Sequence, residues 1–403
     1  MRSQLARLLV GWLALLTVAA GCRQAEGPGA KAVASTPTAP DTTTAGHSPD
    51  APVEPPGPHH VVTFNAGLAR NYVPYIEARL PAIIAELNKL EADVVCLQEV
   101  WEERDLKAVV KGVKKSFPFS TYVDSANSIF ARHASAPSCG PNDLQALAEC
   151  VGEKCAAAPD KTGCVMQQCG THFLSLPSQC RTCLAANVSK PLTEIVETCT
   201  SKGVQMGYDG ANGLLLLSRS KFLDANHIIL DSFLMQRIVL HGILQVGGEN
   251  MNVFCTHFTT PIAEVEYGGR FASWEGEQLA QVKRTIEYVK EKSGEEPAVL
   301  LGDFNLGPAN AEWEVAAEFP DHFQLFLDAG FQSPYTQEHG HCTFCGIKAL
   351  GADGPGKLID HALFLGCAEK VLLPDRVMES NVEVGDDLKV PLSDHYGVRV
   401  GFD

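Results

Sequence analysis

Seven short apolar runs, with helical periodicity between them, constrain the fold of this chain more than any other feature. The runs are Val61–Phe64, Val94–Leu97, Leu214–Leu217, Val253–Cys255, Val299–Leu301, Ala362–Leu365 and Gly397–Val400. Several are continuously apolar, which is typical of strands that are covered on both faces. Helical periodicity appears in Tyr75–Leu90 and Trp274–Val289. This succession predicts a layered α/β domain.

Polar side chains follow most of these runs. After Ala298–Leu301 the chain reads Gly302-Asp303-Phe304-Asn305, and strand alternation predicts Asp303 and Asn305 on one side with Phe304 in the core. A simple turn would also explain this acid and amide. The ends of the other runs supply Asn65, Glu99, His257, Asp360, Asp394 and His395. Polar groups at the ends of successive strands are expected to meet at one edge of a layered sheet.

Each of these residues also has a purely structural explanation. Glu99 could be the charge at the start of a helix over Trp101–Val110. His257 could be a hydrogen-bonded core histidine, and Asp394 a helix cap or turn residue. Helix caps do not account for the whole set, so the sequence favours a functional site.

The motifs that carry this set resemble those of the endonuclease/exonuclease/phosphatase superfamily. They are Thr-Phe-Asn65, Leu-Gln-Glu99, Thr-His257, Gly-Asp303-Phe-Asn305, Ile-Asp360-His and Ser-Asp394-His395, in the family's order. The resemblance covers about residues 59 to 403 and omits a cysteine-rich stretch. It implies a four-layer sandwich of two mixed β-sheets flanked by helices.

The resemblance also implies a metal-dependent hydrolase of phosphoester bonds. In the family's pattern Glu99 is the central metal ligand, and Asn65 and Asp394 assist it. Oxygen ligands of this kind suit Mg²⁺, with Mn²⁺ as a substitute. His395 would lie at the phosphate and be oriented by Asp360, a pairing that raises the imidazole pKa.

The remaining roles follow the same resemblance. Asp303 would position or deprotonate the attacking water, and Asn305 and His257 would hold phosphate oxygens. Either Asp303 or His395 could be the general base. His361 is interpreted as structural.

The substrate is predicted to be a phosphodiester, either a phospholipid head group or a nucleic acid. The formal net charge of −16 argues against broad attraction to nucleic acid or anionic membranes, although a bound cation can invert the local field. The segment around Thr256-His257 and the later Glu277-Gln278-Leu279 resemble the sphingomyelinase branch, but Glu275 stands where arginine is often found. The favoured hypothesis is a sphingomyelinase-like phosphodiesterase. The alternatives are an exported endonuclease acting on DNA or RNA, and a non-catalytic binding lipoprotein.

The first residues predict export. Arg2 and Arg7 precede an apolar stretch over Leu8–Ala20. The chain then reads Ala-Ala-Gly-Cys22 at the end of this stretch. This pattern predicts a signal peptide over residues 1–21 and resembles a lipobox, so Cys22 would carry a lipid anchor. The expected location is the outer membrane or cell surface, with ordinary secretion as the alternative. Residues 22–58 are rich in Pro, Ala, Thr and Gly and predict a disordered tether before a domain over 59–403. No obligate protein partner is expected.

Eight of the 14 cysteines lie between Cys139 and Cys199. In an exported chain they predict disulfides that cross-link a helical insertion over residues 134–205. Its role is interpreted as structural, with substrate gating or partner binding as the alternative. The spacings Cys342-x-x-Cys345 and Cys180-x-x-Cys183 favour a disulfide over a zinc site. Cys96, Cys255 and Cys367 lie in apolar runs and are predicted to pack as small buried side chains.

Overall fold

The computed structural model describes residues 59–124, 137–140, 142–159, 161–201, 206–246, 249–262, 265–366, 374–385 and 387–402. All of these belong to one compact unit, Pro56–Asp403. The predicted signal peptide and tether, including Cys22, lie outside the described residues, as does Cys367. No helix within the described ranges combines the length and the apolarity that a membrane crossing requires.

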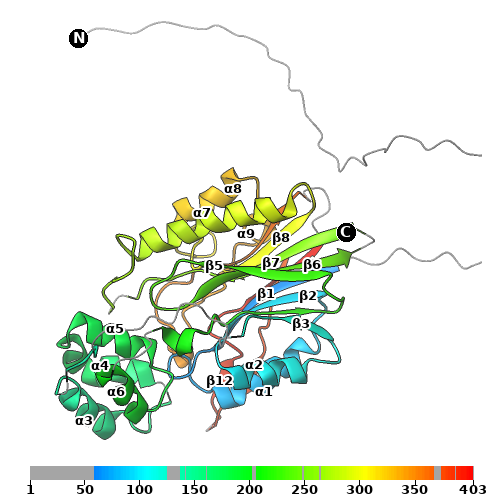
Figure 1. Ribbon diagram of the computed structural model, residues 1–403. Helices are drawn as coiled ribbons and strands as arrows, with labels where there is room; N and C mark the ends of the chain where they lie inside the picture. Colours follow the sequence, from blue (N-terminus) through cyan, green and yellow to red (C-terminus); the bar gives the residue numbers. More distant parts are fainter. Residues whose placement is uncertain are drawn as a thin grey trace, which may run out of the picture. The chain divides into compact units, whose positions relative to one another are not determined.

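Two mixed β-sheets form the centre of this unit (Figure 1). One sheet has the strand order β10-β13-β1-β2-β4-β3. Its strands are β1 (His59–Leu68), β2 (Val94–Val100), β3 (Phe119–Thr121), β4 (Leu215–Ser218), β10 (Asp375–Val377) and β13 (Gly397–Phe402). The other sheet has the order β5-β6-β7-β8-β9. Its strands are β5 (Asp224–Leu230), β6 (Arg237–Val246), β7 (Glu249–His257), β8 (Ala298–Asp303) and β9 (Asp360–Leu365). A small hairpin joins β11 (Asn381–Glu383) and β12 (Lys389–Pro391).

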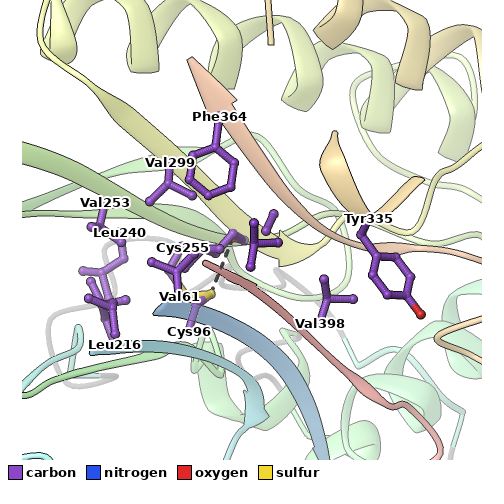
Figure 2. Packing of buried hydrophobic residues seen from close by; sticks show 14 of the residues in the cluster. Val61, Cys96, Leu216, Leu240, Val253, Cys255, Val299, Tyr335, Phe364 and Val398 are labelled. Carbon is purple, nitrogen blue, oxygen red and sulfur yellow. Dashed lines mark hydrogen bonds between the residues drawn. A yellow bond between two sulfur atoms is a disulfide. The ribbon is translucent and has the colours of Figure 1, made fainter. Parts of the chain in front are cut away.

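The two sheets pack face to face through an apolar layer, part of which Figure 2 shows. Val61 and Leu216 come from one sheet, and Val253 and Val299 from the other. Burial of this apolar surface is the main force that holds the two sheets together.

Helices cover the outer faces of both sheets. Side chains of α1 (Ile76–Leu87) and α2 (Glu103–Gly112) pack on the six-stranded sheet, whereas α7 (Trp274–Ser293) and α8 (Pro320–Asp328) cover the other. A short α9 (Pro334–Glu338) follows α8. The resulting helix–sheet–sheet–helix arrangement confirms the predicted fold class.

All seven predicted apolar runs coincide with strands, except that Leu214 precedes β4, but β3, β5, β6, β10, β11 and β12 were not predicted. In β5, Asp224–Leu230, most residues are exposed or only partly buried, as expected for the edge of a sheet. In β6 the apolar pattern is interrupted by His241, Gly242 and Gln245. Both strands are therefore stabilised by pairing with neighbours rather than by a clear local pattern.

Four helices lie between β3 and β4 and contain the crowded cysteines. They are α3 (Gln145–Lys154), α4 (Lys161–Leu174), α5 (Ser178–Ala186) and α6 (Leu192–Thr200). All eight cysteines of this segment form disulfides, as predicted: Cys139–Cys180, Cys150–Cys169, Cys155–Cys164 and Cys183–Cys199. We call the described residues 137–201 the cysteine-rich insertion.

Two predictions about individual cysteines were wrong. Cys180 and Cys183 do not pair with each other, because both lie on α5 and each reaches a different neighbouring segment. Cys96 and Cys255 are fully buried, as predicted, but they form a disulfide between β2 and β7 (Figure 2). Their strands face each other across the two sheets, and the Cα atoms of the two cysteines are 5.6 Å apart. The predicted Cys342–Cys345 disulfide is confirmed.

The cysteine-rich insertion contacts the segment that follows β1. Asn71 Nδ2 donates to the Val188 carbonyl at 2.7 Å, and Tyr72 Oη donates to the Ala185 carbonyl at 3.0 Å. Lys190 Nζ also lies 2.7 Å from Asp209 Oδ1, in the segment that precedes β4. These polar contacts join the insertion to the sandwich near the end of β1.

Candidate active site

The ends of three adjacent strands place His257, Asp303 and Asp360 in one row. His257 on β7 is paired with Asp303 on β8, and Asp303 is paired with Asp360 on β9. In the other sheet, Asn65 on β1 is paired with Gln98, next to Glu99 on β2. The predicted site residues therefore lie at one end of the sandwich, as the strand-end pattern suggested.

Asp303 connects the two sheets. Its Oδ2 accepts a hydrogen bond from Asn65 Nδ2 at 2.9 Å. The same oxygen lies 3.5 Å from His257 Nε2 and 3.8 Å from His395 Nε2. Burial and the charge of Asp360 raise the pKa of Asp303 to about 7, although His395 and the hydrogen bonds lower it. This carboxylate can therefore exchange a proton near neutral pH.

His395 and Asp360 form a buried pair. His395 Nδ1 lies 2.8 Å from Asp360 Oδ2, and the Asp360 backbone amide donates to Thr343 Oγ1 at 3.1 Å. Burial by itself would lower the pKa of His395, but Asp360 raises that pKa well above its ordinary value through charge and hydrogen bonding. The imidazole is therefore positively charged at neutral pH, with its Nε2 on the side of Asp303.

Glu99 lies at the end of β2 in a left-handed backbone conformation with φ of 59°. Burial raises its pKa, the charge of Asp394 raises it further, and His395 together with an Asn65 hydrogen bond lowers it. Because α2 begins only at Glu103, Glu99 is not the start of a helix. The explanation of Glu99 as a helix-start charge is therefore wrong.

Oxygen atoms of Glu99, Asp394 and Asn65 form a donor set that fits a hard divalent cation. Asn65 Oδ1 accepts a hydrogen bond from the Gly67 amide at 2.9 Å, which fixes the orientation of the side-chain amide. The Asp394 carboxylate lies close to Gly67, where an added Cβ would come within 2.6 Å of Asp394 Oδ1. Only glycine allows this approach, and its φ of 54° is also unfavourable for other residues.

Asn305 is held by backbone groups. It has a left-handed φ of 51°, and its Nδ2 donates to the Phe258 carbonyl at 3.0 Å. Gln278 on α7 donates through Nε2 to the carbonyls of Asn305 and Thr259, both at 2.9 Å. As predicted, Phe304 between the two polar residues is fully buried. The helix thus fixes the loop that follows Asp303.

His257 is not a hydrogen-bonded core histidine. It is 3% exposed, and its Nδ1 has no hydrogen-bond partner among the described residues. Burial lowers its pKa well below the ordinary value, and the charges of Arg237 and His395 lower it further. His257 is therefore neutral at the pH where His395 is charged.

His361, by contrast, fits its structural interpretation. Its Nε2 lies 2.9 Å from the Leu306 carbonyl, and burial lowers its pKa to about 4.

Sequence reasoning missed Arg79, which is fully buried in α1. Its guanidinium donates to the carbonyls of Pro74, Ala66, Leu392 and Gly67 at distances of 2.8, 3.2, 2.9 and 2.6 Å. It therefore ties the end of β1 to the loop that carries Asp394. A signal was present, because Arg79 falls three residues after Ile76 on the apolar face of the helix.

Comparisons with known proteins identify a family and similar folds. Residues 62–395 match the Endonuclease/Exonuclease/phosphatase family. A search of curated proteins gives no match. Sphingomyelinase C from Streptomyces griseocarneus is similar in structure, with a TM-score of 0.52 and 16% identity over 86% of this chain and 100% of that chain. The structure of beta toxin 275-280 from Staphylococcus aureus gives a TM-score of 0.51 and 12% identity over 85% of this chain and 99% of that chain. These structural matches show a shared fold.

Proposed function

The chain belongs to the endonuclease/exonuclease/phosphatase family, whose members hydrolyse phosphoester bonds, and we propose that it is a Mg²⁺-dependent phosphodiesterase of the sphingomyelinase-like type. The observation that carries the proposal is the His395–Asp360 pair, whose second ring nitrogen lies 3.8 Å from the Asp303 carboxylate. A cationic donor and a titratable acceptor thus lie side by side in a buried site.

The protonation states assign roles to these two groups. Because the pKa of His395 is raised well above its ordinary value, its imidazolium is a hydrogen-bond donor to a phosphate oxygen. The pKa of Asp303 is about 7, so a substantial fraction of this carboxylate is free to accept the proton of an attacking water. The oxygen of that water bonds to phosphorus as the ester P–O bond breaks. This division of roles favours Asp303 as the general base.

Glu99, Asn65 and Asp394 would hold the metal ion. Their donor atoms are oxygens, which Mg²⁺ prefers and Mn²⁺ also accepts. Burial and the negative charge of Asp394 raise the pKa of Glu99, an arrangement that a nearby cation would relieve. When bound, the ion supplies positive charge to the phosphate oxygens.

A phospholipid head group is the favoured substrate class. The net charge of −16 disfavours a polyanion such as DNA, whereas a single head group needs only the local charge of the site. The fold shared with sphingomyelinase C supports the same choice.

Export and anchoring at Cys22 rest on the sequence between Arg2 and Cys22. Cys22→Ala should move the protein from the membrane fraction to the soluble fraction, and an unchanged distribution would contradict the anchor.

The test is hydrolysis of sphingomyelin, phosphatidylcholine, plasmid DNA, RNA and bis-nitrophenyl phosphate, with Mg²⁺ and with a chelator. Chelation and Glu99→Gln should each lower kcat/KM by at least about 100-fold, the scale expected when charge stabilisation at the reacting group is lost. Added Mg²⁺ or Mn²⁺ should restore activity after chelation. Glu103→Gln is the matched control, because Glu103 is exposed on α2 and pairs with Lys107.

Two results would change the proposal. Full activity in excess chelator would exclude the metal-dependent mechanism. Faster cleavage of DNA or RNA than of sphingomyelin would favour the endonuclease alternative.

A further inference from the structure

Several unpartnered polar atoms surround the buried ring of Trp101 beside the candidate active site. Tyr208 stacks on this ring at 4.8 Å, the His257 ring lies 6.0 Å away, and Arg237 Cζ lies 5.6 Å from its centre. Arg237 Nε and Nη1, His257 Nδ1 and Tyr208 Oη have no hydrogen-bond partner in the part of the chain that the structure describes. Arg237 contributes two of these atoms.

Arg237 is charged although it is only 5% exposed. Burial lowers its pKa to about 10, while Glu99, Asp303 and Glu277 raise it, so the guanidinium stays protonated at neutral pH. A buried cation with unpaired N–H groups is unfavourable, and native proteins rarely keep one without a use for it.

Arg79 shows what a structural arginine looks like in this same protein. It is also buried, but its Nε, Nη1 and Nη2 atoms all donate to backbone carbonyls. Arg237 lacks such partners at Nε and Nη1. The contrast indicates that Arg237 is not placed there to hold the backbone.

The position of Arg237 relates it to the reacting groups. It begins β6, where Val239 is paired with Thr256, so Arg237 lies beside the end of β7 that carries His257. Its charge interacts with the carboxylates of Glu99 and Asp303 across the site. The flat guanidinium group presents a rigid fork of N–H donors. Such a fork can donate to one phosphate oxygen or to two.

We propose that Arg237 binds the phosphate group of the substrate by donating from an unpartnered N–H group, at Nε or Nη1, to a non-bridging oxygen, with the Trp101 ring supporting the guanidinium group. This inference rests on the proposed function and adds a phosphate-binding residue to it. The negative charge that develops on phosphate oxygens during hydrolysis would then be met by Arg237 as well as by His395.

The test compares Arg237→Gln and Arg237→Lys with the wild-type protein. Two quantities are measured: kcat/KM for bis-nitrophenyl phosphate with Mg²⁺, and the Kd of inorganic phosphate by calorimetry without added metal. Arg237→Gln should lower kcat/KM by about 100- to 1000-fold, the scale for losing one oxyanion donor. It should also weaken phosphate binding by at least about 10-fold, as expected for a charge-assisted contact. Arg237→Lys should keep part of the activity and part of the phosphate binding, because lysine retains the positive charge but lacks the fork of donors.

Arg399→Gln is the matched control, since Arg399 pairs with Asp375 on β10 and should leave both quantities unchanged. A folded Arg237→Gln protein that binds phosphate as the wild type does would overturn the inference. If Arg237→Gln does not fold, unchanged phosphate binding in Arg237→Lys overturns it equally. If the wild type cleaves no phosphodiester, the proposed function is refuted. The calorimetric comparison of phosphate binding still decides the role of Arg237.

Discussion

The sandwich and the cysteine-rich insertion are stabilised in different ways. The two sheets bury a continuous layer of Val, Leu, Ile and Phe side chains between them. In the insertion, cysteines make up most of the fully buried side chains, and four disulfides join short helices. Small elements with little core depend on such cross-links. All eight predicted site residues lie in the sandwich, the part of the chain that is held together mainly by its apolar layer.

Among the described residues, two disulfides lie outside the insertion, Cys342–Cys345 and Cys96–Cys255, and the second joins the two sheets of the sandwich. It connects β2 to β7 across a sequence separation of 159 residues. Glu99 follows Cys96 on β2, and His257 follows Cys255 on β7. The covalent link therefore lies directly behind the site, where the two sheets must keep their relative positions.

The largest expected effect is a loss of kcat/KM with no loss of folding in either region. Asp360→Asn removes the charge that keeps His395 protonated, so kcat/KM for a soluble phosphodiester should fall by about 1000- to 10,000-fold, as in related carboxylate–histidine pairs. Both regions should stay folded by circular dichroism. Asp353→Asn is the control, because Asp353 is an exposed partner of Lys348. Activity within about threefold of the wild type would contradict the role of Asp360 in positioning His395.

The next effect compares the two kinds of disulfide. Cys96→Ala together with Cys255→Ala should lower the free energy of unfolding of the sandwich by about 3–5 kcal/mol, because the bond closes a long loop. Cys155→Ala with Cys164→Ala opens a loop closed over a separation of only 9 residues. That change should cost about 2–3 kcal/mol and leave kcat/KM unaltered. Urea unfolding with a separate probe in each region measures the free energy of unfolding of both double variants. If the two variants destabilise the sandwich equally, the two regions are not independent.

The smallest effect on the sandwich should come from deleting Ala134–Lys202 and joining the ends with a Gly-Ser linker. The deletion removes contacts such as Asn71 with Val188 and Lys190 with Asp209 but leaves every predicted site residue. Activity on bis-nitrophenyl phosphate should stay within about threefold, whereas hydrolysis of a lipid or polymer should change if the insertion covers the site. A chain that no longer folds would show that the insertion belongs to the folding unit of the sandwich.

Local patterns predicted the strands that are covered on both faces and the polar residues that follow them. They predicted that Asp303 and Asn305 would lie beside a buried Phe304, because strand alternation is a local property. They did not predict the Cys96–Cys255 bond, since that pairing depends on how two sheets align across a long separation. Arg237 gave no signal either, because an arginine at the start of an apolar run usually reaches solvent. Arg237 is nevertheless buried, with Trp101 packed near its guanidinium group.

The pairing of β1 with β13 determines when the candidate active site can assemble. Asn65 comes from the first described strand, whereas Asp394 and His395 precede the last one, and Arg79 donates to Leu392 to join these ends. A chain made from its amino end must therefore be synthesised at least as far as His395 before the two halves of the site can meet. Until then the residues of the candidate site are apart. For a hydrolase of phosphoester bonds, this late assembly would spare the lipids and nucleic acids of the producing cell.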